Sequence, residues 1–192
     1  MFIQTETTPN PNTLKFLPGQ EVLGSQTAFF TDKENAASSP LASALFVLPD
    51  IRAVFFGSDF ITVTKTELAS WEILKPQILT TMMEHYQSGN PLMLEGNAAP
   101  AKADDGITRP ESYSDDEQEI VDQIKELLET RVRPAVAQDG GDIIFHSFKE
   151  GIVYLEMHGA CSGCPSSTAT LKSGIENMLK HYVPEVMAVE PV

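Results

Sequence analysis

Residues 159–167 read Gly-Ala-Cys-Ser-Gly-Cys-Pro-Ser-Ser, and this run contains both cysteines of the chain, Cys161 and Cys164. An apolar, strand-like segment precedes the run and a helix-like segment follows it. Pro165 suits the first turn of that helix, because its missing N–H would be unpaired there in any case. Unpaired amides and the positive end of the helix dipole favour a thiolate over a thiol at such a position. The run therefore predicts a strand-to-helix loop that presents two thiolates.

Two cysteines in C-x-x-C spacing can bind one metal centre, but thiolate-ligated zinc and iron–sulfur sites usually take four ligands. One chain supplies half of that set, and a second copy related by a two-fold axis would complete it. Without a metal, the pair would act as a dithiol/disulfide switch. His158 could add a ligand, although we expect it to end the preceding strand. The spacing alone leaves zinc, iron–sulfur and redox chemistry open.

The composition is that of an acidic globular protein. The chain has 192 residues, enough for one or two domains, and its 27 acidic and 13 basic residues give a net charge of −14. This charge argues against binding to nucleic acid or to anionic membranes, which attract basic patches. A transmembrane helix needs about 18 consecutive apolar residues, and the sequence has no such run. No Ser-His-Asp order, P-loop or paired carboxylates stand out, so we expect no hydrolytic active site.

One break in composition divides the chain. Residues 90–110 are rich in Ala, Pro, Gly, Asp and Asn and lose their periodicity, which indicates a flexible linker. We therefore predict an α+β protein of two small mixed domains, residues 1–89 and 114–192, joined by a linker at 90–113. In the first domain the pattern predicts strands at 2–6, 13–16, 53–56 and 60–64, a helix at 40–47 and a helix that begins after Ser70 and ends near Gln87.

The second domain is predicted to follow the order α-β-β-α-β. Ser114-Asp115-Asp116-Glu117 is a capping-box sequence, and the helix that it begins should bend or stop near Pro134. Asp139-Gly140-Gly141-Asp142 is interpreted as a turn in which both glycines are free to take positive φ. A hairpin at 143–148 and 152–157 follows, then the cysteine loop, a helix that ends before Pro184, and a strand at 186–189. We expect the cysteine loop to carry no core side chain, so that Cys161→Ser should leave the fold intact.

The turn at 139–142, the hairpin and the cysteine run together resemble the C-terminal domain of NifU, an Nfu-type iron–sulfur domain. This resemblance covers about residues 114–192. The opening residues, Phe-Ile-Gln-Thr-Glu-Thr-Thr-Pro-Asn-Pro-Asn-Thr-Leu-Lys-Phe at 2–16, resemble the N-terminal domain of the Nfu scaffold proteins. Full-length NifU has further cysteine-bearing domains, and since this sequence has none we expect no second scaffold site.

The resemblance implies an iron–sulfur cluster scaffold or carrier rather than an enzyme. Such proteins hold a [4Fe–4S] cluster between two chains, each of which gives one C-x-x-C pair, and pass it to apo client proteins. The ligand role carries over to Cys161 and Cys164, and the expected partners are a second copy of the chain when the cluster is bound, apo clients and upstream cluster-assembly proteins. The alternatives are a thiol–disulfide oxidoreductase and a zinc-bridged interaction module.

The first residues of the sequence show no basic region followed by an apolar one, and no Arg-rich, acid-poor stretch. Two cysteines do not make the disulfide framework of a secreted protein. Mitochondrial members of the resembled family carry a transit peptide, which is not seen here. We therefore expect a bacterial protein of the reducing cytoplasm, with a processed mitochondrial form as the alternative.

Overall fold

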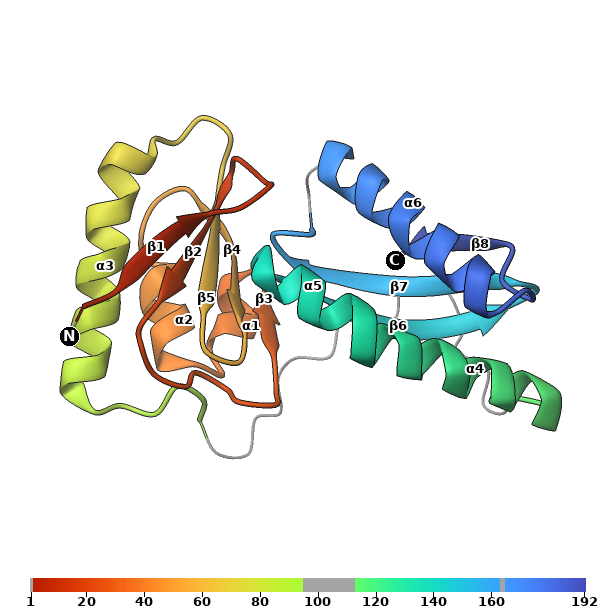
Figure 1. The fold of residues 1–192 in the computed structure, drawn as a ribbon. Helices are drawn as coiled ribbons and strands as arrows, with labels where there is room; N and C mark the ends of the chain where they lie inside the picture. The colour runs from red at the N-terminus through yellow and green to blue at the C-terminus, as the bar shows by residue number, and fades with distance from the viewer. Residues whose placement is uncertain (1, 95–112, 163–164) are drawn as a thin grey trace. The chain divides into compact units, whose positions relative to one another are not determined.

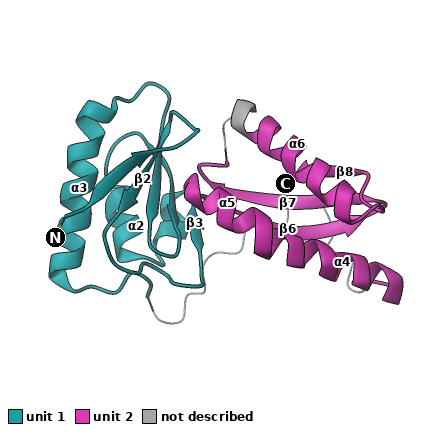
Figure 2. Cartoon of the chain, in the orientation of Figure 1, with its two compact units in different colours: residues 1–101 teal, residues 102–192 magenta. Residues whose placement is uncertain are grey.

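The computed structural model describes residues 2–94, 113–162 and 165–192, without the side chains of 165–167. It divides into two compact units, residues 1–101 (unit 1) and 102–192 (unit 2), shown in Figure 2. This division falls within the predicted linker at 90–113, but residues 95–112 of that linker lie outside the described residues. Each unit combines a sheet with helices (Figure 1), so the predicted α+β class with two domains is confirmed.

Unit 1 is built on a five-stranded antiparallel sheet in the order β1-β2-β5-β4-β3. β1 and β2 are joined by a turn in which the Thr8 hydroxyl donates to the carbonyl of Asn10 at 2.9 Å. The four predicted strands are all present, whereas β3 was not predicted, because a three-residue strand is too short to show a period-two pattern. The strands are β1 (Gln4–Thr7), β2 (Thr13–Leu17), β3 (Ala28–Phe30), β4 (Ile51–Phe56) and β5 (Ile61–Lys65).

Three helices complete the described part of unit 1: α1 (Lys33–Ala36), α2 (Pro40–Leu45) and α3 (Trp71–Ser88). The α3 helix begins where Ser70 accepts the amide of Glu72 at 3.3 Å, and it continues through Pro76. Its apolar stripe packs into the core with side chains from α2 and the sheet. The fully buried members of this core include Phe16, Phe30, Leu41, Leu45, Val54, Phe56, Ile61, Ile78 and Met82.

Unit 2 follows the predicted order of helix, two strands, helix and strand. Its elements are α4 (Asp115–Leu127), η1 (Leu128–Val132), α5 (Arg133–Gln138), β6 (Gly141–Lys149), β7 (Ile152–Gly159), α6 (Pro165–Tyr182) and β8 (Ala188–Pro191). The capping box is confirmed, because the Glu117 amide donates to the Ser114 hydroxyl at 3.4 Å while the Glu117 carboxylate accepts the Ser114 amide at 3.1 Å. β6 and β7 pair antiparallel, and β8 joins β7 in parallel.

The first helix of unit 2 does not stop at the predicted proline. It widens into a π turn at Leu128–Val132, where the Arg133 amide donates to the carbonyl of Leu128. The helix then runs on as α5, and Figure 1 shows α4 and α5 as one continuous coil. In a regular α-helix the Pro134 ring would crowd the carbonyl four residues back, and no amide would be present to bond it. A π turn just before the proline avoids both the crowding of the ring and the missing hydrogen bond.

One core joins the helices of unit 2 to its sheet. The β6–β7 hairpin of this unit turns at Glu150 and Gly151, both at positive φ. No described helix is long and apolar enough to cross a membrane. The most buried core side chains are Val121 and Ile124 of α4, Ile143 of β6, Val153 and Leu155 of β7, Leu179 of α6 and Val189 of β8.

Candidate metal centre

The first cysteine lies in the loop that connects β7 to α6. β7 ends at Gly159, which takes a positive φ of 63° and turns the chain, and the Ser162 amide donates to the Gly159 carbonyl at 3.1 Å. From α6, the Thr168 hydroxyl donates to the carbonyl of Cys161 at 3.1 Å. The Cys161 backbone is thus held to both flanking elements. The second predicted ligand, Cys164, lies outside the described residues.

Cys161 is a core residue in this structure. Only 5% of it is exposed, and it belongs to the hydrophobic cluster of unit 2. The expectation that the cysteine loop carries no core side chain is therefore wrong. The reason is that the turn after β7 directs this side chain inward, toward the start of β6, instead of outward to solvent.

The start of β6 forms one wall of the space around the Cys161 thiol. The Ala160 amide donates to the Gly140 carbonyl at 3.1 Å, and Gly141 pairs with Gly159 across the two strands. A Cβ atom at Gly141 would overlap Cys161 Sγ and would lie 2.9 Å from the His158 carbonyl oxygen. The absent side chain of Gly141 is thus what makes room for the sulfur.

The two glycines of the turn at 139–142 serve different purposes. Gly140 has a φ of 81°, so the prediction of positive φ is confirmed at this position. Gly141 is not at positive φ and is instead the first residue of β6. The prediction was wrong for Gly141, because the side chain is excluded there by the approach of Cys161 and not by a backbone requirement.

The surroundings of Cys161 favour a protonated thiol. Burial raises its pKa to about 12, and the nearby carboxylates of Asp139 and Asp142 act in the same direction. The expectation that the helix start stabilises a thiolate is therefore not met at Cys161, because desolvation and the two negative charges all raise the pKa of this thiol. A metal ion reverses this balance, since its own charge replaces the thiol proton.

Asp142, the residue that follows Gly141 in β6, belongs to a network of charged side chains. Arg133 donates from Nε and Nη2 to the two carboxylate oxygens of Asp142, both at 2.8 Å, and from Nη1 to Glu129 at 2.6 Å. The Asp142 carboxylate also accepts the amide of Ile143 at 2.8 Å. These hydrogen bonds raise the pKa of Arg133 above its usual value. Asp142, interpreted from the sequence as the last residue of the turn at 139–142, is the second residue of β6 and a buried ion-pair partner, only 4% exposed.

His158 is placed as expected, next to the end of β7. Its Nε2 lies 2.9 Å from the carboxylate of Glu156, and 8% of the residue is exposed. Within the described residues, no three His, Cys, Asp or Glu side chains converge into a metal site. A small loop with a thiol and a glycine wall fits a thiolate-bound iron or zinc centre better than a hard cation, which prefers carboxylate oxygens.

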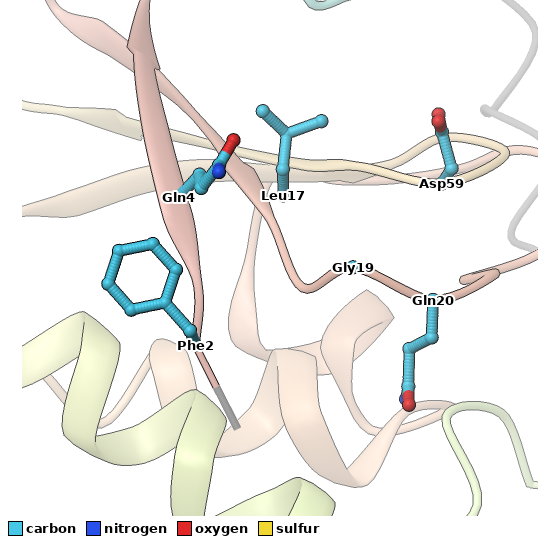
Figure 3. Close-up of a pocket in the computed structure, with 6 residues that line it drawn as sticks. All are labelled: Phe2, Gln4, Leu17, Gly19, Gln20 and Asp59. Atoms are coloured by element: carbon cyan, nitrogen blue, oxygen red, sulfur yellow. The ribbon is translucent and has the colours of Figure 1, made fainter.

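Unit 1 has no cysteine, and its described pocket has a single carboxylate among its lining residues. Figure 3 shows this open pocket of about 430 Å³, in which Phe2 and Gln4 come from the β1 side and Asp59 from the turn of the β4–β5 hairpin. Asp59 is the only ionisable lining residue; the others are Phe2, Gln4, Leu17, Gly19 and Gln20. The pocket has no group of convergent catalytic or metal-binding side chains.

The two units and the buried Cys161 before α6 define a two-domain α+β protein with a candidate thiolate site in its second domain. The family model described as "Scaffold protein Nfu/NifU N terminal" matches residues 3–89, and the model described as "NifU-like domain" matches residues 124–190. Together these matches fall on both units. The chain therefore belongs to the Nfu family of NifU-like scaffold proteins.

Named relatives agree with this assignment. The chain is 55% identical over 192 residues to "NifU-like protein 4, mitochondrial" of Arabidopsis thaliana, covering 99% of this chain and 65% of that protein. It is 49% identical over 193 residues to "NFU1 iron-sulfur cluster scaffold homolog, mitochondrial" of Homo sapiens, covering 100% of this chain and 72% of that protein. Against the solution structure of a NifU-like protein from Saccharomyces cerevisiae the TM-score is 0.43 at 30% identity, over 50% of this chain and 86% of that one.

The expectation of a bacterial cytoplasmic protein is contradicted by these relatives. The plant and human proteins, and a Drosophila persimilis relative that is 51% identical, are all named mitochondrial. The expectation rested on the first residues of the sequence. Because the chain spans only 65% of the plant and fly relatives, those residues are no guide to a targeting segment.

Proposed function

We propose that this protein is an iron–sulfur cluster scaffold or carrier that binds a [4Fe–4S] cluster between two copies of the chain. Cys161 and Cys164 of each copy are the proposed ligands. The observation that supports the proposal most directly is the loop of Cys161, where the backbone of Gly141 leaves room for the sulfur. Family membership supports the same function, since the named relatives are iron–sulfur cluster scaffold homologues.

Ligand counting favours a shared cluster. A thiolate-bound [4Fe–4S] cluster takes four sulfur ligands, and the chain has two cysteines. The described residues offer no third or fourth ligand beside Cys161. Two chains related by a two-fold axis supply four thiols without any further residue.

Cluster binding requires two changes at Cys161. The thiol must lose its proton, which the positive charge of iron favours and the surrounding carboxylates oppose. The sulfur must also turn outward, because a ligand shared between two chains cannot stay 5% exposed in the core of one of them. Both changes are reversed on release, so a buried, protonated Cys161 favours transfer of the cluster to a client.

Transfer needs only an exchange of thiolate ligands between this protein and an apo client. No bond of an organic substrate is made or broken in that process, so we propose a carrier and not an enzyme. Unit 1, which has no thiol, is proposed to contact clients and upstream cluster-assembly proteins.

The test is anaerobic reconstitution of the full chain with ferrous iron and a sulfide source. We expect a brown protein with a broad absorption band near 400 nm, four irons and four sulfides per two chains, and a doubled mass on size-exclusion chromatography with light scattering. Loaded protein should then restore activity to apo-aconitase in the presence of a chelator. A colourless protein that binds zinc, or one that reduces disulfide substrates with turnover, would replace this proposal with one of the two alternatives.

A further inference from the structure

We propose that Arg133 is a positioning residue for the cluster site: its bidentate contact with Asp142 holds the start of β6 against Cys161 and so controls how readily the sulfur leaves its buried position. This inference rests on the proposed function. It assigns a role to a residue that is not a ligand and is far from the cysteine run in the sequence.

The contact has the geometry of a strong, directional ion pair. Both carboxylate oxygens of Asp142 accept from the guanidinium at 2.8 Å, and the Asp142 side chain is 6% exposed whereas that of Arg133 is 28% exposed. Planar two-point contacts of this kind fix orientation as well as distance. Glu129, one turn earlier in the helix, holds the third guanidinium nitrogen at 2.6 Å. The guanidinium is therefore held by Asp142 through Nε and Nη2 and by Glu129 through Nη1.

The position of the carboxylate determines the position of the glycine wall. Asp142 follows Gly141 directly, and one Asp142 oxygen also accepts the Ile143 amide, so the first three residues of β6 move with the ion pair. Gly141 is the residue that meets Cys161 Sγ. A shift of Asp142 toward solvent would therefore pull the wall away from the sulfur.

The π turn at 128–132 is a second observation that points to a functional role for Arg133. The wide turn at 128–132 comes immediately before Arg133 and Pro134. π turns of one helical turn occur frequently at functional sites. Arg133 is the first residue after this π turn, and its guanidinium reaches Asp142 of β6.

The experiment compares Arg133→Gln with the unchanged full chain in two measurements. In the metal-free protein, alkylation of Cys161 by iodoacetamide is followed by peptide mass spectrometry, which separates it from Cys164. In the loaded dimer, cluster loss to a chelator is followed by visible absorption. We expect Arg133→Gln to raise the alkylation rate of Cys161 several-fold and to lengthen the lifetime of the bound cluster several-fold, because the sulfur then returns less readily to its buried position. Arg133→Lys, which keeps the charge but not the two-point contact, should fall between the two.

The matched control is Leu179→Ala, which weakens the same core through a fully buried residue of α6 without touching the ion pair. Denaturant unfolding ranks the variants by stability. If Leu179→Ala changes the rates of alkylation and of cluster loss in the same direction and as much as Arg133→Gln at equal loss of stability, the role of Arg133 is only structural and the inference is overturned. The inference is also overturned if Arg133→Gln changes neither rate.

The two proposals fail in different ways. If the unchanged chain takes up no cluster, the proposed function is wrong, whatever the variants do. If the unchanged chain loads normally and Arg133→Gln matches it in both rates, only the positioning role is wrong. The removal of a positive charge near Cys161 disfavours the thiolate, so faster alkylation in Arg133→Gln would report exposure of the sulfur and not a change in its charge.

Discussion

The backbone of Gly141 lies against Sγ of Cys161, so the first residue of β6 forms a wall beside the proposed ligand. Neither residue could fill its place with a larger side chain without moving the other. The contact joins the turn after α5 to the loop before α6, two segments that are distant in the sequence. Because Gly141 belongs to β6 and β6 pairs with β7, the position of the Cys161 sulfur depends on the β6–β7 hairpin.

Gly141→Ala should destabilise unit 2 and disturb the site. The new Cβ would overlap Sγ and crowd two backbone atoms, the His158 oxygen at 2.9 Å and the Cys161 nitrogen at 3.1 Å, so the strands must shift. We expect a loss of about 1–3 kcal/mol in the free energy of unfolding. Denaturant titration followed by circular dichroism measures it, while fluorescence of the single tryptophan, Trp71, reports unit 1 separately.

Gly174→Ala is the control for that change, because a Cβ at this exposed position of α6 meets nothing within 4 Å. Alanine is the better helix former, so this variant should be more stable by about 0.5–1 kcal/mol. Equal effects of the two glycine substitutions would contradict the wall at Gly141.

Cys161→Ser should abolish cluster binding and also weaken the fold. A hydroxyl in place of the buried thiol has no place among the apolar side chains around it, and we expect a cost of about 1–3 kcal/mol. Cys161→Ala should bind no cluster either but should be more stable than the serine variant. Iron and sulfide analysis after reconstitution tests the first part, and denaturant unfolding tests the second. Full iron content in either variant would remove Cys161 from the ligand set.

Alkaline pH should lower the stability of the metal-free protein through Cys161. The pKa of this thiol is raised in the folded state from 9.0 to about 12, so the folded state binds the proton more tightly than the unfolded state. The stabilisation is complete below about pH 9 and is lost as the pH rises toward 12. Unfolding free energies measured under reducing conditions from pH 9 upward should fall more steeply for the unchanged chain than for Cys161→Ala. Parallel slopes would show that the thiol is not buried in solution.

Ser114→Ala should cost about 1 kcal/mol of stability in unit 2, because both halves of the capping box depend on this residue. The hydrogen bonds from Ser114 also lower the pKa of Glu117, so the effect should shrink in acid as that carboxylate is protonated. Ser173→Ala, at an exposed position within α6, is the matched control and should be neutral or slightly stabilising. Thermal or urea unfolding of both variants provides the comparison, and an equal loss in the two would argue against the cap.

Elements with a strong local signal could be predicted from the sequence. The capping box at Ser114, the serine cap of α3 and the hairpin around Gly151 depend on residues close together in the chain, so local physics determines them. β3 and α1 were missed because segments of three and four residues are too short to show periodicity. Pro134 was expected to stop or bend the helix, and the structure instead has a π turn just before it, with Leu128 and Val132 buried in the core of unit 2.

The sequence by itself determined the chemistry that the chain can offer: two thiols in C-x-x-C spacing, between a strand-like and a helix-like segment. Only the tertiary structure decided that Cys161 is buried and protonated, that Gly141 is needed for its lack of a side chain, and that Arg133 holds Asp142 beside the site. The physical reason is that ligand type and local turns are properties of neighbouring residues. Burial, pKa and ion pairing depend on groups that folding brings together from distant parts of the chain.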